Sequence, residues 1–180
     1  MILKNLRKRK NININITRSI NMSKVLVAYF SASGVTAALS KRLADSIGAD
    51  LFEIKPQVTY TDTDLDWRDK QSRSSVEMAD KSSRPAISEK VDNIEQYSTV
   101  YVGFPVWWYR EPSIIDTFIE SHDFKGITIV PFATSGGSDI GDSYKNIQEL
   151  APGSTVVQGK RFDKDASAQE LKTWAAQWIK

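Results

Sequence analysis

The sequence predicts an α/β domain with a parallel β-sheet at its centre. Apolar runs typical of buried strands alternate with stretches whose apolar residues recur at helical spacing, and polar turns separate them. The chain has 180 residues, enough for one domain with a sizeable core, and it contains no internal repeat. Strands separated by helices pair in parallel, because each right-handed crossover returns the chain to the same end of the sheet.

The first half of the chain opens with an uninterrupted apolar strand, Val25–Phe30, followed by a helix over Ala37–Ala44. A second strand, Ala49–Lys55, alternates apolar and polar residues, which is typical of a strand near an edge. A long polar connection over 56–85 follows, and it contains one predicted helix around Leu65–Asp80.

The second half contains a third strand, Ser98–Phe104, apolar enough to be central, and a short helix over Ser113–Ser121. The fourth strand, Ile127–Thr134, contains Pro131, which cannot donate a hydrogen bond to a neighbouring strand. We therefore expect a bulge or an early end to the pairing there. The remaining predicted elements are a helix over Asp139–Leu150, a short fifth strand over Thr155–Gly159 and a final helix over Ser167–Ile179.

The composition excludes several classes of protein. The absence of cysteine rules out disulfides, thiolate zinc sites and cysteine nucleophiles. No apolar run approaches the ~20 residues of a transmembrane helix. Six of the 24 basic side chains and none of the 22 acidic ones lie in residues 1–22, so the rest of the chain has a net charge of −4. This mildly acidic domain argues against nucleic acid as a partner.

Residues 1–22 are basic and of low complexity, but they lack the continuous apolar region and the cleavage site of a signal peptide. We expect them to be a disordered basic extension, or a mis-assigned start with Met22 as the true first residue. Residues 23–180 would then form the domain. We expect a cytoplasmic protein that does not associate with membranes.

Three loops are expected to build the functional site. Ligands of parallel α/β sheets bind beyond the carboxyl ends of the strands, at the point where the strand order reverses. The loops that follow the first, third and fourth predicted strands meet this condition. They are Ser31–Thr36, Pro105–Arg110 and Thr134–Gly141.

The first loop has the chemistry of a phosphate site. The first N–H groups of a helix have no partner within the helix, and the helix dipole is positive there. Three hydroxyl side chains add donors, and Gly34 permits a close approach of the backbone. The loop matches neither the P-loop nor the dinucleotide pattern and contains no basic residue, so its donors are neutral. The alternative is that the hydroxyls only cap the helix.

The other two loops suit the ring and the ring edge of a ligand. Three adjacent aromatic residues, Trp107, Trp108 and Tyr109, offer faces on which a flat ring can stack. The alternative is a hydrophobic cluster that covers the sheet edge. In the third loop, Gly136 and Gly137 leave backbone groups free to meet a polar ring edge, although an ordinary turn before a helix would look the same.

Residues 23–180 resemble the flavodoxin family. The loop S-x-S-G-x-T matches the family's T/S-x-T/S-G-x-T pattern, although Val35 stands where many relatives place Asn. The stretch G-F-P-V-W-W-Y-R-E-P, then F-I-E and P-F-A-T-S-G-G-S, is similar to a branch with a G-x-P-x-W-W signature. The resemblance implies a three-layer, doubly wound, five-stranded parallel sheet with the strand order 2-1-3-4-5.

The resemblance also implies FMN as the cofactor. The implied residues are Ser31, Ser33, Gly34, Val35 and Thr36 for the phosphate, Pro105, Val106, Trp107, Trp108 and Tyr109 for the isoalloxazine ring, and Ser135, Gly136 and Gly137 for its polar edge. The redox chemistry would belong to the flavin, so no catalytic side chain and no metal ion are expected.

The implied function is low-potential electron transfer between a reductase and an electron acceptor, by a monomer or weak dimer. The alternative is an FMN-dependent NAD(P)H:quinone or small-molecule oxidoreductase, which needs an open face on the ring. A serine hydrolase would need a G-x-S-x-G motif, which does not occur. Asp62, Asp64 and Asp66 lack the spacing of a calcium loop, which favours a solvated loop.

Overall fold

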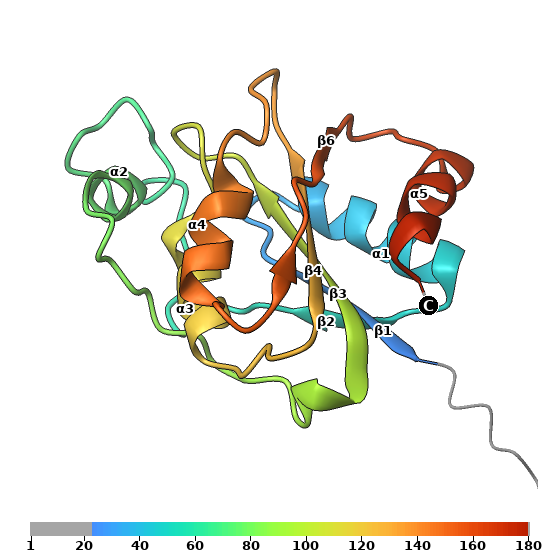
Figure 1. Ribbon diagram of the computed structural model, residues 1–180. Helices are drawn as coiled ribbons and strands as arrows, with labels where there is room; N and C mark the ends of the chain where they lie inside the picture. The colour runs from blue at the N-terminus through green and yellow to red at the C-terminus, as the bar shows by residue number, and fades with distance from the viewer. Residues whose placement is uncertain (1–22, 180) are drawn as a thin grey trace, which may run out of the picture.

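The structure, a computed structural model, describes residues 23–179 and has a central parallel sheet with helices on both faces (Figure 1). The strand order is β2-β1-β3-β4-β5, and β6 also pairs with β4, all in parallel. The strands are β1 (Lys24–Tyr29), β2 (Asp50–Glu53), β3 (Tyr97–Pro105), β4 (Thr128–Thr134), β5 (Thr155–Val156) and β6 (Lys160–Phe162). The predicted fold class and strand order are confirmed.

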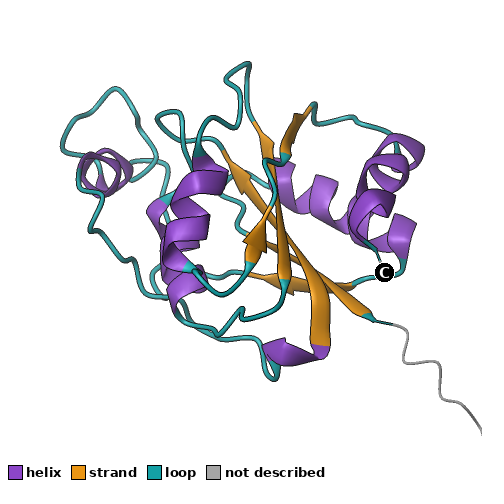
Figure 2. Ribbon diagram, viewed as in Figure 1, coloured by secondary structure: helices purple, strands orange, loops and turns teal. Residues whose placement is uncertain are grey.

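Helices pack on both faces of the sheet and form two outer layers, as Figure 2 shows. They are α1 (Val35–Ile47), α2 (Arg73–Ala79), α3 (Ser113–Glu120), α4 (Ser143–Leu150) and α5 (Ala168–Ala175), with short 3₁₀ helices over Ile94–Gln96 and Ala176–Trp178. Helices α1 and α5 cover one face of the sheet, and α3 and α4 cover the other. Helix α2 lies outside these layers, next to α3 and α4.

Alternation along β3 builds both halves of the core. Val100, Val102 and Phe104 point to the α3 and α4 side, whereas Tyr101 points to the α1 and α5 side, and all four are fully buried. The Tyr101 hydroxyl donates to the carbonyl of Ala175 at 2.6 Å, which satisfies the one polar group of that ring. A strand buried on both faces is expected at the centre of a parallel sheet.

The predicted irregularity at Pro131 is confirmed on the β5 side of β4, whereas the pairing of β4 with β3 continues through Pro131 without a break. The carbonyl of Ile129 accepts from Val157 N–H at 3.1 Å, so the next residue on that side of β4 is Pro131, which has no N–H. The neighbouring strand is broken there into β5 and β6. Gly159 lies in the gap with φ +79, and a Cβ at this position would lie 2.2 Å from the Pro131 carbonyl oxygen. The single fifth strand predicted over Thr155–Gly159 is therefore two short strands.

Some predicted helix boundaries differ from the structure. The helix predicted around Leu65–Asp80 begins only at Arg73, because carboxylates bind nearby backbone N–H groups and stabilise turns instead. Asp64 accepts from Thr61 N–H at 2.9 Å, and Asp69 accepts from Gln71 N–H at 2.8 Å. Similarly, α4 begins at Ser143 rather than Asp139.

The expectation for residues 1–22 lies outside the described residues. Within residues 23–179, no helix is both long and apolar enough to span a membrane.

Candidate functional site

A cleft of about 900 Å³ lies at the carboxyl ends of the central strands and brings together parts of all three predicted loops. It is bounded by a fourth segment that the sequence did not indicate. The lining residues are Ala32 and Ser33, then Pro105, Val106, Trp107, Trp108 and Tyr109, then Gly136, Gly137 and Ser138, and finally Leu65, Trp67 and Ser74.

The first loop leaves the N-terminus of α1 open. Gly34 is the N-cap residue, with φ +90, and no side chain among the described residues accepts a hydrogen bond as its cap. Ser31 Oγ instead accepts from Gly34 N–H at 3.1 Å, within the loop. The alternative that the hydroxyls merely cap the helix is therefore wrong, and the first-turn N–H groups of α1 are left to bind an anion.

Thr36 differs from the other residues of this loop, because its side chain is buried. Its hydroxyl lies 2.8 Å from the hydroxyl of Thr134, at the end of β4. Two hydroxyls carry two protons and their mutual bond uses one, so one proton of the pair remains to be donated. The bond also ties the first loop to the strand that leads into the third.

Basic residues reach the phosphate side from outside the loop. A hollow of about 440 Å³ beside Ser33, Gly34 and Val35 is also lined by Arg42, Lys164 and Asp165. Arg42 Nη1 donates to the carbonyls of Lys164 and Ala166, at 3.2 and 2.8 Å. The loop itself offers only neutral donors, and two basic side chains and one carboxylate stand next to it.

The second loop is a tight hairpin with unusual backbone angles. Trp107 and Arg110 exchange two backbone hydrogen bonds, at 3.0 and 3.1 Å. The two residues between them, Trp108 and Tyr109, have φ values of 46° and 66°. This is the pattern of a type I′ turn, which favours Asn and Gly, and each bulky residue held there costs of order 1–3 kcal/mol. Such strain is found most often at functional sites.

The three aromatic side chains of this loop have different environments. Trp107 packs edge-on against Phe30 and Tyr60, with ring centroids 5.5 Å apart in both pairs, so it is partly buried against the core although it also lines the cleft. Trp108 is 44% exposed and Tyr109 is 78% exposed. The alternative of a hydrophobic cluster therefore describes Trp107, whereas Trp108 and Tyr109 remain free to contact a ligand.

The third loop is fixed at its base and open at its tip. Ser135 Oγ accepts from Gly137 N–H at 3.2 Å and donates to the Ser138 carbonyl. Arg161 of β6 donates to the hydroxyl and the carbonyl of Ser135, both at 3.2 Å. No described heavy atom lies within 4 Å of a Cβ built at Gly136 or at Gly137. Their backbone groups can thus be approached by a ligand.

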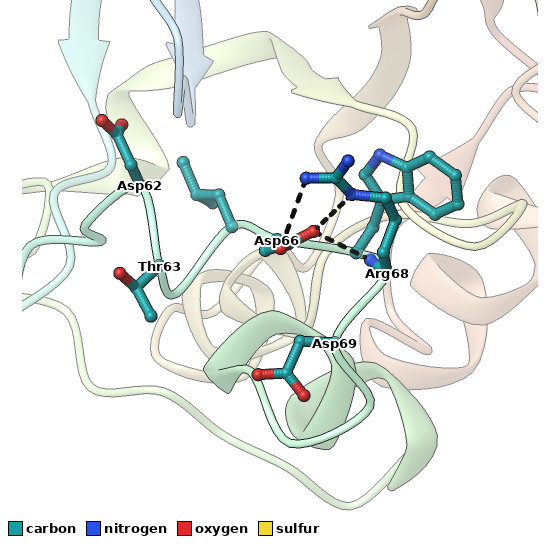
Figure 3. Close-up of a pocket in the computed structure, with 7 residues that line it drawn as sticks. Asp62, Thr63, Asp66, Arg68 and Asp69 are labelled. Carbon is teal, nitrogen blue, oxygen red and sulfur yellow. Dashed lines mark hydrogen bonds and ion pairs between the residues drawn. The ribbon is translucent and has the colours of Figure 1, made fainter.

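The far wall of the cleft comes from the connection between β2 and α2. Trp67 is 72% exposed and lines both this cleft and a neighbouring hollow of about 500 Å³. Figure 3 shows Asp62, Asp66 and Asp69 in that hollow. In that hollow Asp66 is paired with Arg68, whose Nε lies 3.0 Å from Asp66 Oδ1. Within residues 23–179 no group of three or more acidic or histidine side chains has the arrangement of a metal site. The sequence analysis did not identify this wall, and the one signal for it was the presence of Trp67 in an otherwise polar, acidic connection.

A doubly wound parallel sheet with a cleft at the carboxyl ends of its central strands defines the class of α/β proteins that bind nucleotide-like ligands at that edge. Residues 24–178 match the sequence profile of the family described as Flavodoxin. The chain belongs to the flavodoxin family.

Solved structures agree with this assignment. A protein described as a flavoprotein from Bacteroides uniformis is 48% identical, with 86% of this chain and 98% of that chain covered and a TM-score of 0.81. One from Bacteroides eggerthii is 46% identical over 87% and 98% of the two chains, also with a TM-score of 0.81. A flavoprotein from Lactobacillus acidophilus in complex with FMN shares the fold, with 22% identity, 88% and 99% coverage and a TM-score of 0.63. A comparison with curated proteins gave no match.

Proposed function

We propose that this protein binds FMN in the 900 Å³ cleft and acts as a low-potential electron carrier. One observation supports this proposal above all. Trp108, Gly136, Gly137 and Ser33 line a single cleft, and Ser33 directly precedes the uncapped N-terminus of α1. These are binding surfaces for a phosphate, a flat ring and a polar ring edge, and FMN has all three groups. The flavodoxin family and the FMN complex of a protein with the same fold support the same cofactor.

The residues present fit FMN at each end. At the phosphate end, Ser33 would present its hydroxyl and α1 its free first-turn N–H groups, with the residual proton of the Thr36–Thr134 pair behind them. At the ring end, Trp108 would supply the stacking surface and exclude water from one face. FAD should bind less well, because the chain lacks a dinucleotide fingerprint.

The bound FMN would supply the one-electron chemistry, and the chain would orient the ring and set its electrostatic surroundings. Carboxylates of Asp62 and Asp69 line the hollow beside Trp67, in addition to the Asp66–Arg68 ion pair. A negative surrounding disfavours additional negative charge on the ring and so lowers its reduction potential. We propose a separate reductase and an electron acceptor as the protein partners.

The alternative is an FMN-dependent NAD(P)H:quinone or small-molecule oxidoreductase. The exposed Trp67 favours it, because a second exposed indole lining the same cleft as Trp108 offers another surface on which a planar substrate can stack. No dinucleotide fingerprint or basic 2′-phosphate pocket for NADPH accompanies that wall among the described residues.

The two functions are separated by kinetics. We expect negligible steady-state NADPH oxidation by the FMN-loaded protein alone, and rapid reduction when a flavodoxin reductase is added. Fast turnover of NADPH with a quinone, without any partner protein, would replace the carrier assignment with the oxidoreductase. Trp67→Ala is the matched variant: it should leave carrier function intact, but it should slow quinone turnover if that turnover is real.

A further inference from the structure

A buried polar cluster lies directly behind the strained hairpin that presents Trp108 and Tyr109. The chain leaves the hairpin through Arg110 and Glu111, and Glu111 is fully buried. Asp116, on the first turns of α3, is buried beside it. Two carboxyl groups in one buried cluster require an explanation, because buried charge is unfavourable unless it is compensated.

Arg110 connects the hairpin to α3. Its guanidinium Nη1 lies 3.0 Å from the Glu111 carbonyl and 3.4 Å from Asp116 Oδ2, and Nη2 donates to Ser113 Oγ at 3.1 Å. Nη1 also lies 3.9 Å from Glu111 Oε1. One guanidinium therefore stands between both carboxyl groups while its own backbone closes the hairpin.

Glu111 connects the same hairpin to α4. Its N–H donates to Ser143 Oγ at 3.0 Å, and its Oε1 accepts from Asn146 Nδ2 at 3.2 Å. The loop before α4 also touches the hairpin, because a Cβ built at Gly141 would lie 2.6 Å from the Tyr109 carbonyl oxygen. The hairpin is thus held from two helices through this cluster.

The cluster has one unsatisfied atom, Asp116 Oδ1, which is buried without a hydrogen-bond partner among the described residues. Three basic and three acidic side chains line the adjoining cavity of about 160 Å³. They are Lys81, Arg84 and Arg110 against Glu111, Asp116 and Glu149. Arg84 is committed mainly to Glu120, at 2.8 and 3.0 Å, and lies 3.9 Å from Asp116. Arg84 is therefore a weak partner for Asp116.

A proton explains the unsatisfied oxygen. Burial, and next the neighbouring Glu111 carboxylate, raise the pKa of Asp116 to about 8, against the opposing effect of Arg110 and Arg84. A protonated Asp116 has a hydroxyl to donate to Glu111, and the pair then bears one negative charge opposite Arg110.

We propose that Glu111 and Asp116 share one proton and that this pair is a positioning device, which holds the strained Trp108–Tyr109 turn against the cleft and loosens it when the proton is lost. The proposal rests on the proposed function, because its consequence is read through FMN. Loss of the proton puts two negative charges in one buried cluster and destabilises it. The strained Trp108–Tyr109 turn should move first, because leaving its present conformation relieves backbone strain. FMN affinity should therefore fall as the pH rises past the point at which the proton leaves.

The experiment measures the Kd for FMN from about pH 7 to about pH 9, a range in which a phosphate monoester with a second pKa of about 6 has lost its last proton. The variants are Asp116→Asn, whose amide imitates the protonated acid, and Asp45→Asn, a matched change on the exposed face of α1. The emission of Trp108 in the FMN-free protein is followed over the same pH range, as the difference between the wild type and Trp108→Phe.

We expect the wild-type and Asp45→Asn Kd values to rise about threefold or more across this range, while that of Asp116→Asn stays nearly constant. Trp108 emission should change with a midpoint near the same pH in the wild type. An equal rise in Asp116→Asn overturns the pair while FMN binding stands. If no FMN binds at any pH, the proposed function fails, and a Trp108 emission that does not respond to pH then overturns the pair independently. The emission experiment also decides the matter if Asp116→Asn does not fold.

Discussion

The hydroxyl pair Thr36–Thr134 gives a prediction whose size follows from the structure. The two oxygens are 2.8 Å apart, and the residues are 1% and 4% exposed. Thr36→Val keeps the shape of the side chain but leaves the Thr134 hydroxyl without this buried partner, which should lower the free energy of unfolding by about 1–3 kcal/mol. Thr134→Val should cost a similar amount, since the Thr36 hydroxyl is then left without its partner.

The double variant separates the bond from other effects. Replacing both hydroxyls leaves neither buried group unsatisfied, so the double variant should be more stable than the sum of the single losses by about 1–2 kcal/mol. Urea unfolding of the FMN-free proteins measures all four corners of the cycle. Additive losses would show that the two hydroxyls are not coupled and would refute the structural reasoning.

The same variants test the phosphate site. If the Thr36 hydroxyl donates a hydrogen bond to the phosphate, Thr36→Val should weaken FMN binding by about 1–3 kcal/mol, or about 5- to 150-fold in Kd. Riboflavin affinity should barely change. Ser33→Ala is the control, because Ser33 is exposed: it should weaken FMN binding without altering stability. Equal losses for FMN and riboflavin would indicate a folding defect rather than a lost phosphate contact.

Three further outcomes are expected. Tyr109→Gly should raise stability in urea unfolding by about 0.5–2 kcal/mol, because it relieves a φ of 66° at an exposed side chain; a loss would contradict the assigned strain. Gly159→Ala should cost about 2 kcal/mol or more, since its Cβ meets the Pro131 carbonyl, and should cost clearly more than Gly126→Ala, which has a similar φ but open space. The raised pKa of Asp116 means that the folded state keeps a proton that the unfolded chain releases. The free energy of unfolding of the wild type, relative to Asp116→Asn, should therefore fall as the pH rises from about 4 to about 8 and level off above. A difference between the two proteins that does not vary with pH would contradict the raised pKa.

The parts of the fold encoded by local patterns were predictable. The apolar run of β1, the turn 31–36 and the start of α1 are consecutive in sequence, so the loop proposed for the phosphate could be located without tertiary information. Pro131 predicted the interruption between β5 and β6, because a proline has no N–H to donate to the neighbouring strand.

Features that depend on distant segments were not predictable. Trp67 reaches the cleft from a connection without hydrophobic periodicity. Arg161 reaches Ser135 from β6, and Lys164 reaches the hollow beside the first loop from the loop after β6. The positive φ values of Trp108 and Tyr109 could not be predicted either, because the sequence lacks the Asn and Gly that normally mark such a turn. Tertiary contacts behind the hairpin override the local preference.

The binding of FMN, compared with riboflavin and FAD, tests the central claim most directly. The FMN-free protein is titrated into each flavin, and quenching of flavin fluorescence is followed to saturation. We expect one FMN bound per chain, with riboflavin about tenfold weaker or more because it lacks the phosphate that α1 would hold, and with FAD also weaker. Absence of quenching and of thermal stabilisation by saturating FMN, or equal affinity for FMN and riboflavin, would contradict the account.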